Sequence, residues 1–474
     1  MDDLFQQLWS KFLRIGECVL DALEKGVDYQ ELQGKVREEL DGLGREIMRS
    51  VIEAADERLR LNRSERRGWV VEQRNHVKEL LTPFGPLRYA RTYFKHSASQ
   101  SYAYLADQMM GITPHQRIDA GLMGELVERA TEQSFRRSGE WSEEKSWRVS
   151  GQTVMKASRR IEMTDCRPVP ASRALRRLPY VFIQADEDHV PNQKGPRWQP
   201  RLVTVHEGTD GPPERRRLVD PMRFGGLYLR GEAEQLYEEV WKYLDATYDL
   251  ERVEAILVSG DGASWIRGLC EYLPGAEFVL DRFHARKYVL AATGSDGDLY
   301  RELWQALHEA DRGQMRSVMA KAKERAETAA QKERVMESLR YFESRWDGVT
   351  AWKRYEGIWP GCSAEGDVSH VYAARMSSRP MAWGREGVDQ MSRLRVMCCN
   401  GGSVKEAYLK QHSQTMTPVR VARTYISEAR RQIQSHRNIA TMLRGNMPVM
   451  NSSHRALRRM LRSVIDKNRL FPTR

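Results

Sequence analysis

The most constraining feature of the sequence is the alternation of short apolar runs with helical stretches over residues 178–283. Five runs have the length and composition of strands: LPYVFIQAD, RLVTVHE, GGLYLR, EAILVSGDG and AEFVLDRFH. The amphipathic stretches EAEQLYEEVWKYLDATYD and ASWIRGLCEYL separate the third run from the fourth and the fourth from the fifth. The predicted order β-β-β-α-β-α-β is typical of an α/β domain with a mixed sheet and helices on its faces, in which sites form at the carboxyl ends of strands.

The regions around this α/β core are predicted to be mainly helical, at both the N-terminal and the C-terminal end. Residues 1–62 begin with apolar side chains at four-residue spacing and continue in long charged stretches, which predicts a helical arm. Aromatic and β-branched residues flank a Pro-Phe-Gly-Pro breaker in residues 68–95, which predicts a small antiparallel pair of strands. Residues 291–356 are rich in Ala, Glu, Lys and Arg and contain no Pro, so they predict an all-helical insertion into the core.

The basic residues are concentrated at the C-terminal end. The formal net charge of the chain is +11, and residues 420–474 contain twelve Arg and one Lys against Glu428 and Asp466, so this tail accounts for the whole excess. A dense Arg cluster indicates a polyanionic partner such as DNA, because each neutralised phosphate releases condensed counterions. A solvated basic helix that binds nothing is the alternative interpretation.

Composition also bears on the compartment. No window approaches the ~18 consecutive apolar residues that a membrane-spanning helix needs, and the N-terminus opens with acidic rather than basic residues. The six cysteines include no C-x-x-C pair, which argues against a zinc ribbon. These features predict an intracellular, cytoplasmic protein with no membrane partner.

Residues 118–160 fit a helix-turn-helix pattern. The turn Val149-Ser150-Gly151 precedes the helical stretch QTVMKASRR, in which Lys156 shares a face with Arg159 or Arg160 at three- and four-residue spacing. We expect these three basic side chains to contact DNA, as the last helix of such a motif does. Simple packing of a short helical hairpin explains the same pattern equally well.

Three acidic positions stand where the predicted core would place a metal site. Asp186 ends the first apolar run, Asp261 lies between two glycines after the fourth, and Glu365 opens a helical stretch after the insertion. Carboxylates that converge from strand ends and a facing helix suit hard divalent cations. Each acid also has an ordinary alternative, since Asp-Gly is a common turn and a first-turn Glu is favoured by the helix dipole. The combination is what predicts a metal centre.

Two neighbouring acids compete for ligand positions. Asp188 cannot be separated from Asp186 by periodicity, because residues two apart in a strand point to the same face, whereas Glu187 should point away. Asp186 is favoured because it directly follows the apolar run. Asp367 lies about 200° around the helix from Glu365, so only one of these two acids should reach the metal. We expect it to be Glu365, on the face that meets the sheet.

Four motifs, in their order along the chain, resemble those of the ISLre-type insertion-sequence transposases. This DDE family has a ribonuclease-H-like catalytic domain and is similar to the Mutator-like group. The motifs are ADEDHV (185–190), SGDGASWI (259–266), LDRFHARKY (280–288) and GCSAEGDVSHVYAARMSSRPMAW (361–383), with an all-helical stretch before the last.

The resemblance implies a metal-binding triad of Asp186, Asp261 and Glu365, and a role for His284 within the motif of Cys or Asp, two residues, then His. The residues themselves are compatible with that role, because His284 follows a strand end and could touch a scissile phosphate or position a metal-bound water. A capped core histidine is the alternative.

The expected function is that of a DNA transposase. Two Mg²⁺ ions, which Mn²⁺ can replace, would support hydrolysis of a phosphodiester at the end of the element, and the released 3′-hydroxyl would then attack target DNA. The expected partners are transposon-end and target DNA and further copies of the chain on that DNA, with no small-molecule substrate. The expected location is the cytoplasm, at the nucleoid. Two alternatives stay open: a ribonuclease-H-like nuclease without strand transfer, and a non-catalytic, domesticated DNA-binding protein.

These interpretations divide the chain into six parts. They are a helical arm (1–62), a small β plus helix-turn-helix-like DNA-binding region (63–170), the first part of the ribonuclease-H-like core (171–290), the all-helical insertion (291–358), the second part of the core with Glu365 (359–415) and the basic tail (416–474).

Overall fold

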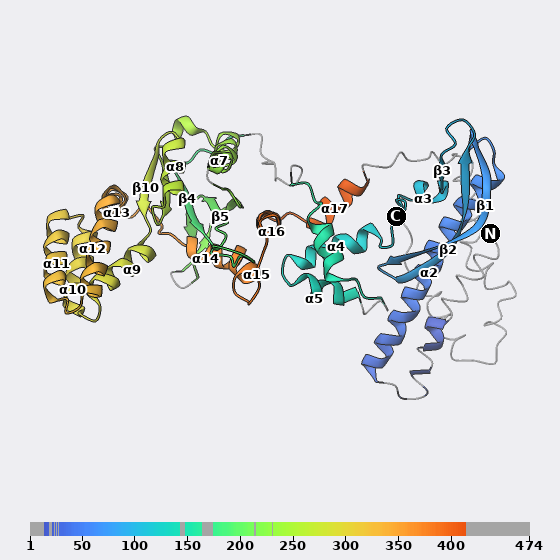
Figure 1. The fold of residues 1–474 in the computed structure, drawn as a ribbon, viewed down its shortest axis with the longest axis horizontal. Coiled ribbons are helices and arrows are strands. Elements are labelled where there is room, and N and C mark those ends of the chain that lie inside the picture. The colour runs from blue at the N-terminus through green and yellow to red at the C-terminus, as the bar shows by residue number, and fades with distance from the viewer. Residues whose placement is uncertain are drawn as a thin grey trace, which may run out of the picture. The chain divides into compact units, whose positions relative to one another are not determined.

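The structure is a computed structural model that describes residues 28–142, 147–163, 174–212, 215–229 and 231–413, with a few positions between 14 and 26 (Figure 1). The expected basic tail lies outside the described residues. The described chain forms two compact units. The first comprises residues up to Gly124 together with 139–149 and 409–413, and the second comprises 125–138 and 150–408.

A long helix and a β-hairpin dominate the first unit, as the sequence predicted. Helix α2 spans Tyr29–Leu61, and strands β1 (Trp69–Thr82) and β2 (Gly85–His96) pair antiparallel across a two-residue turn. The short strand β3 (Tyr102–Ala103) adds to β2, and helix α3 (Leu105–Met109) follows. Carboxylates of α2 accept the N–H groups of Ala90 and Thr92, which would otherwise be unpaired on the outer edge of β2.

The second unit is built on a five-stranded mixed sheet. Its strands are β4 (Tyr180–Glu187), β5 (Arg201–His206), β8 (Met222–Gly226), β9 (Ala255–Gly260) and β10 (Ala276–Leu280). The spatial order is β10-β9-β4-β5-β8, in which β4, β9 and β10 are parallel to one another and β5 and β8 are antiparallel to their neighbours. Helix α7 (Ala233–Thr247) leads to β9 and helix α8 (Ser264–Tyr272) leads to β10. The predicted β-β-β-α-β-α-β order is therefore confirmed, with a small extra hairpin of β6 (Thr209–Asp210) and β7 (Arg217–Leu218) and a 3₁₀ turn at Leu250–Arg252.

One strand boundary was wrong. The third strand was expected over residues 225–230, but β8 ends at Gly226. Gly225 near the end of β8 lets the Tyr372 hydroxyl and the Arg201 carbonyl lie close to the strand, because a Cβ at this position would meet both groups. Leu227 and Tyr228 stay buried beyond the strand, so their apolar character reflects packing rather than sheet pairing.

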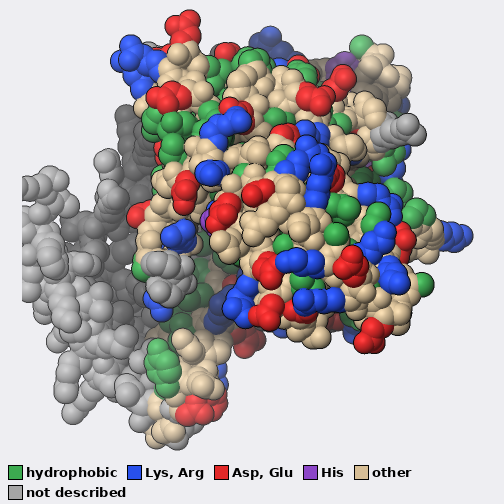
Figure 2. Space-filling view, turned by 90° about the vertical axis from the view of Figure 1, so that its left-hand side faces the viewer, with side chains coloured by type: hydrophobic (Ala, Val, Ile, Leu, Met, Phe, Trp, Pro, Cys, Tyr) green, Lys and Arg blue, Asp and Glu red, His purple; other side chains and the backbone are tan. Residues whose placement is uncertain are grey.

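The expected insertion is helical throughout its regular elements. Helix α9 (Arg282–Thr293) leads into it from the core, and its own helices are α10 (Gly297–His308), α11 (Arg312–Arg325), α12 (Ala329–Ser344) and α13 (Trp346–Arg354). Figure 2 shows cationic and acidic side chains interspersed on the face that this segment presents. The helices of this segment carry ion pairs between such side chains: Arg316–Glu343 at 2.5 Å, Lys321–Glu302 at 2.9 Å and Arg325–Asp296 at 2.7 Å.

The remaining elements of the described chain are also helical. Residues 364–376 form one helix in three parts, α14 (Ala364–Val368), a π-helical turn (Ser369–Ala373) and α15 (Ala374–Met376). Helices α16 (Arg385–Cys399) and α17 (Val404–Ser413) follow, and α4 (Ala120–Ala130), α5 (Phe135–Glu140) and α6 (Gly151–Ser158) precede the sheet. Among the described residues, no helix is long and apolar enough to cross a membrane.

Candidate metal centre

Asp186 stands near the carboxyl end of β4, the central strand of the sheet, and is 7% exposed. Its Oδ1 accepts the N–H of Glu187 at 2.9 Å, whereas its Oδ2 is buried without a hydrogen-bond partner. Burial raises the pKa of Asp186 to about 7, and the charges of Asp261 and Glu365 add to the rise. An unpaired buried carboxylate oxygen is costly, and a cation could supply the partner that this oxygen lacks.

His284 reaches the same place from the first turn of α9, directly after β10. Asp281 is the N-cap of that helix, where Oδ1 accepts the N–H of Phe283 and Oδ2 contacts Nδ1 of His284 at 3.0 Å. A proton on Nδ1 leaves Nε2 as the open ring nitrogen, which is how metal-binding histidines are usually oriented by a carboxylate. Burial lowers the pKa of His284, but the hydrogen bond with Asp281 and the charge of Asp186 outweigh it, so the net pKa is raised.

Glu365 lies in the first turn of α14 and is exposed. Gln184 of β4 positions this turn, because its Oε1 accepts the backbone N–H of Ser363 at 2.9 Å and the Ser363 hydroxyl at 3.1 Å. One ligand atom each from Asp186, His284 and Glu365 lie within 4.8 Å of one another. These three residues could hold a metal ion, and they come from elements far apart in the sequence.

Asp261 is close to this cluster without being one of its three members. Its carboxylate accepts the N–H of Ala263 at 2.8 Å, and its charge contributes to the raised pKa values of Asp186 and His284. Side chains of α12 hold the loop from outside: the Tyr341 hydroxyl and Arg345 Nε donate to the Asp261 carbonyl at 3.1 and 2.7 Å.

Both glycines beside Asp261 are required by the backbone. A Cβ on Gly260 would lie 2.7 Å from the carbonyl oxygen of Ala185, and Gly262 has φ +79°, a left-handed conformation that glycine adopts without strain. Close packing of β9 on β4 is an additional reason for Gly260.

The acids that flank Asp186 are engaged elsewhere. The Ser377 hydroxyl donates to both carboxylate oxygens of Asp188, at 3.0 and 2.8 Å, and burial raises the pKa of that carboxyl group. Glu187 accepts the indole N–H of Trp265 at 2.7 Å, so it points away as expected. Asp188, a candidate ligand from sequence, is therefore not among the three clustered residues, and the geometry favours Asp186.

Asp367 is directed away from the cluster, as the helix phase predicted, but it does not face solvent. Its carboxylate accepts hydrogen bonds from Arg223 at 2.9 Å and from the Thr204 hydroxyl at 2.6 Å. The expectation that one straight face of this helix meets the sheet was wrong in part. Glu365 and Ser369, four residues apart on the same side of the helix, are exposed, whereas Val368 and Tyr372 are buried.

The basic residues expected to bind DNA lie on or just after α6, whose N-cap is Ser150. Lys156 and Arg160 are exposed, and Arg159 pairs with Glu386 of α16 at 3.4 Å. Gln390 of α16 also donates to the carbonyl of Ser158. The helix thus packs within the second unit while keeping two basic side chains available, and DNA contact stays a prediction.

The residues that position the cluster were not predicted from the sequence. Asp281 lies in a motif quoted above, but its contact with the His284 ring was not inferred. Its place at a helix N-cap, three residues before His284, is the signal that could have identified this contact. Gln184 is a single polar residue inside an apolar strand run, a signal that a buried hydrogen-bond network is needed there. Nothing in the sequence indicated a role for Arg345 and Tyr341, because only the folded insertion brings them to the loop that carries Asp261.

Comparison with known proteins places this chain in a family. Residues 22–413 match the family described as "Uncharacterised protein family (UPF0236)". One UPF0236 protein of Caldanaerobacter subterraneus subsp. tengcongensis is 35% identical over 420 residues, covering 88% of this chain and 89% of that protein. Another from the same organism, whose name joins eleven locus designations, is 34% identical and covers 88% of both chains. The UPF0236 protein in vanSb 3'region of Streptococcus gallolyticus is 25% identical over 342 residues, 70% of this chain and 75% of that protein.

Proposed function

The chain belongs to the UPF0236 family, and we propose that it is a DNA transposase with a ribonuclease-H-like core. It would hydrolyse a phosphodiester at the end of a mobile element and join the resulting 3′-hydroxyl to target DNA. The observation that carries this proposal is the cluster of Asp186, His284 and Glu365 at the carboxyl edge of the mixed sheet, with Asp261 beside it.

The donor set fits divalent cations that prefer oxygen. Asp186 and Glu365 supply carboxylates, Asp261 supplies a third nearby, and the unpaired Oδ2 of Asp186 is a ready ligand atom. Carboxylate-rich sites suit Mg²⁺ and Mn²⁺, and two such ions would stabilise the attacking and leaving oxygens of a phosphoryl transfer. A donor set of carboxylates with one imidazole also suits Mn²⁺, which is consistent with Mn²⁺ replacing Mg²⁺.

The side chains of this protein would contribute position and proton control. Asp281 holds the imidazole of His284 by Nδ1, so Nε2 faces the cluster and can contact either a metal or a non-bridging phosphate oxygen. Gln184 fixes the turn that carries Glu365, and Arg345 fixes the loop that carries Asp261. The acidic residues are thus held by polar contacts before any ligand arrives, which lowers the cost of assembling the site.

Two further observations support a mobile element and a DNA partner. The name of one relative joins eleven locus designations in one organism, and that of another joins four, as expected for a gene that is copied within a genome. The Arg-rich composition of residues 420–474 suits contact with DNA phosphates. We also propose that copies of the chain assemble on DNA in the cytoplasm, at the nucleoid, without a small-molecule substrate.

A cleavage assay on DNA that contains the ends of the element tests the proposal. The wild-type protein should nick such DNA in Mg²⁺ and in Mn²⁺, and Asp261→Asn and Glu365→Gln should lose cleavage while keeping DNA binding. Glu333→Gln is a matched control, because Glu333 is exposed on α12 and pairs only with Arg340 among the described residues. Near wild-type cleavage by Asp261→Asn or Glu365→Gln would remove that residue from the site.

The same assay separates the alternatives. Cleavage without joining of the 3′-end to a target plasmid would indicate a nuclease. DNA binding with no cleavage in either metal would indicate a non-catalytic binding protein, although such a protein would have no need for the intact acidic set.

A further inference from the structure

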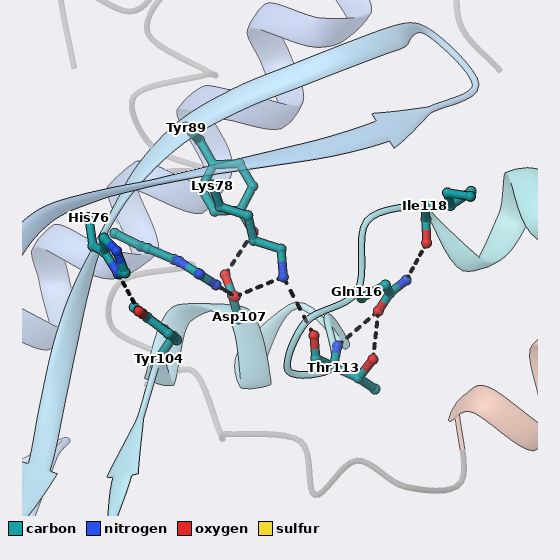
Figure 3. A network of polar contacts seen from close by, with 9 residues as sticks. His76, Lys78, Tyr89, Tyr104, Asp107, Thr113, Gln116 and Ile118 are labelled. Carbon is teal, nitrogen blue, oxygen red and sulfur yellow. Dashed lines mark hydrogen bonds and ion pairs between the residues drawn. The ribbon is translucent and has the colours of Figure 1, made fainter. Parts of the chain in front are cut away.

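The first unit contains a cavity of about 810 Å³ that takes no part in the candidate metal centre. It lies beside β1, β2 and β3, with residues 104–117 forming another side (Figure 3). The charged side chains that line it carry an excess of positive charge: Lys78, Arg88, Arg91 and Arg117 against Glu79 and Asp107. A cavity with this balance attracts anions.

Part of this charge is buried and fixed. Asp107 accepts the Tyr89 hydroxyl at 2.7 Å and Lys78 Nζ at 3.4 Å, and it is also bonded to Arg91 (Figure 3). The Lys78 and Asp107 side chains are only 6% and 4% exposed. Two cations therefore share one carboxylate, and Arg91 Nε is buried without a hydrogen-bond partner. Burial lowers the pKa of Lys78, and the charge of Asp107 opposes this.

A series of stacked rings leads from this network to the surface. The Arg91 guanidinium lies 3.5 Å from the ring centroid of Tyr104, and Tyr104 and Tyr93 are 4.8 Å apart. Tyr93 stacks in turn on Tyr102 at 5.1 Å with an interplanar angle of 12°. The side chain of Tyr102, at the outer end of the series, is 46% exposed. Lys95 Nζ lies 5.7 Å from the ring centroid of Tyr102, so an exposed ring and a further cation stand together at the outer end of the series.

Strand β1 is distorted just before the residues that line the cavity. Its register with β2 shifts twice between Val71 and His76, and Asn75 has φ +58°. Bulges of this kind re-aim side chains and are frequent beside functional sites. Here the strand resumes regular pairing at His76, whose ring stacks on Tyr104.

We propose that this cavity binds an unpaired nucleotide of a DNA strand, with its base stacked on Tyr102 and its phosphates held by Arg88 and Arg117. Stacked aromatic rings beside cationic side chains are the combination that binds single strands, because every base has a π-face and every linkage a charge. An acidic peptide would use the charges but not the flat ring surface. The choice of DNA rests on the proposed function, since an unpaired nucleotide arises at a cleaved element end.

Fluorescence polarisation with the full chain tests this site, in EDTA so that catalysis plays no part. The probes are a labelled single-stranded DNA, the same strand in a blunt duplex, and a duplex with an unpaired 3′ extension. Tyr102→Ala should weaken binding of the single strand and the extended duplex by about tenfold, the scale of one lost stacking contact, and leave the blunt duplex unchanged. Tyr29→Ala, which removes another exposed tyrosine of the same unit, should change none of them.

Arg117→Ala provides a second variant, at a side chain that is exposed. It should make the slope of log affinity against log salt shallower by ~0.7 on the single strand, the value for one lost phosphate contact. Wild-type affinity in both variants would overturn the proposal, as would equal losses on single strand and blunt duplex, or binding of the matching RNA in preference to DNA. Loss confined to unpaired DNA together with absent Mg²⁺-dependent cleavage would support this site while refuting the transposase.

Discussion

Asp186→Asn is the sharpest test of the metal centre, because it isolates the charge of a buried carboxylate. The folded protein raises the pKa of Asp186 from an ordinary 3.8 to about 7, so it holds this proton more tightly than the unfolded chain does. The resulting contribution to stability is present at acid pH and is lost as the pH rises through 7. Between pH 5 and pH 8 the loss spans roughly two pKa units, or about 3 kcal/mol at ~1.36 kcal/mol per unit.

An Asn at this position does not titrate, so it escapes that loss. In EDTA the free energy of unfolding of the variant, relative to wild type, should therefore increase by about 3 kcal/mol from pH 5 to pH 8. Urea unfolding followed by tryptophan fluorescence measures this difference, and any constant cost of the amide cancels from the comparison. Adding Mn²⁺ at pH 8 should stabilise only the wild type. A difference that stays the same at both pH values, or equal stabilisation of both proteins by Mn²⁺, would refute the reasoning.

Two further predictions concern residues around the site, and a third concerns the C-terminal tail. Asp281→Asn retains an N-cap but weakens the contact with His284 Nδ1. The Mn²⁺ affinity, measured by calorimetry, should therefore fall about 10–100-fold while the helix content stays unchanged. An unaltered affinity would exclude an orienting role for Asp281. Asp367→Asn leaves the buried Arg223 without its counter-charge and should lower the free energy of unfolding by roughly 3 kcal/mol, while cleavage per folded molecule persists; loss of Mn²⁺ binding instead would show that Asp367 is a ligand. Deleting residues 420–474 should make the salt slope of duplex binding shallower by ~0.9 for each lost phosphate contact, and an unchanged slope would assign DNA binding elsewhere.

The strand pattern could be predicted because burial within the sheet determines the composition of most apolar runs. The runs that became β4 and β9 are almost fully buried between layers, so their composition reports their place directly. The third strand was misplaced because Leu227 and Tyr228 are apolar for a different reason, packing beyond the end of β8. Hydrophobicity records burial, and it does not distinguish a paired strand from a buried extended segment.

The candidate site was predictable in its residues and only partly in its geometry. Asp186 and Glu365 could be named because they follow a strand end or open a helix. A role for His284 was implied by the resemblance to the ISLre-type transposases, and Asp261, the third acid expected in the triad, is not one of the three clustered residues. Asp188 could not be excluded, since the contact that occupies it comes from Ser377, almost two hundred residues away in sequence. The π-helical turn at Ser369 likewise leaves no mark in a pattern read at 3.6 residues per turn.

The helical insertion is best understood as part of the site rather than as an accessory to it. Arg345 and Tyr341 donate to the carbonyl of Asp261, so the loop after β9 is held by the last turns of α12. Trp352 of α13 donates to the carbonyl of Leu280, directly before the N-cap that orients His284. The insertion therefore contacts the backbone at both loops that bring Asp261 and His284 to Asp186. Its outer face carries cationic and acidic side chains (Figure 2), some of them in ion pairs. The inward contacts are therefore the part of the insertion that lies closest to the candidate metal centre.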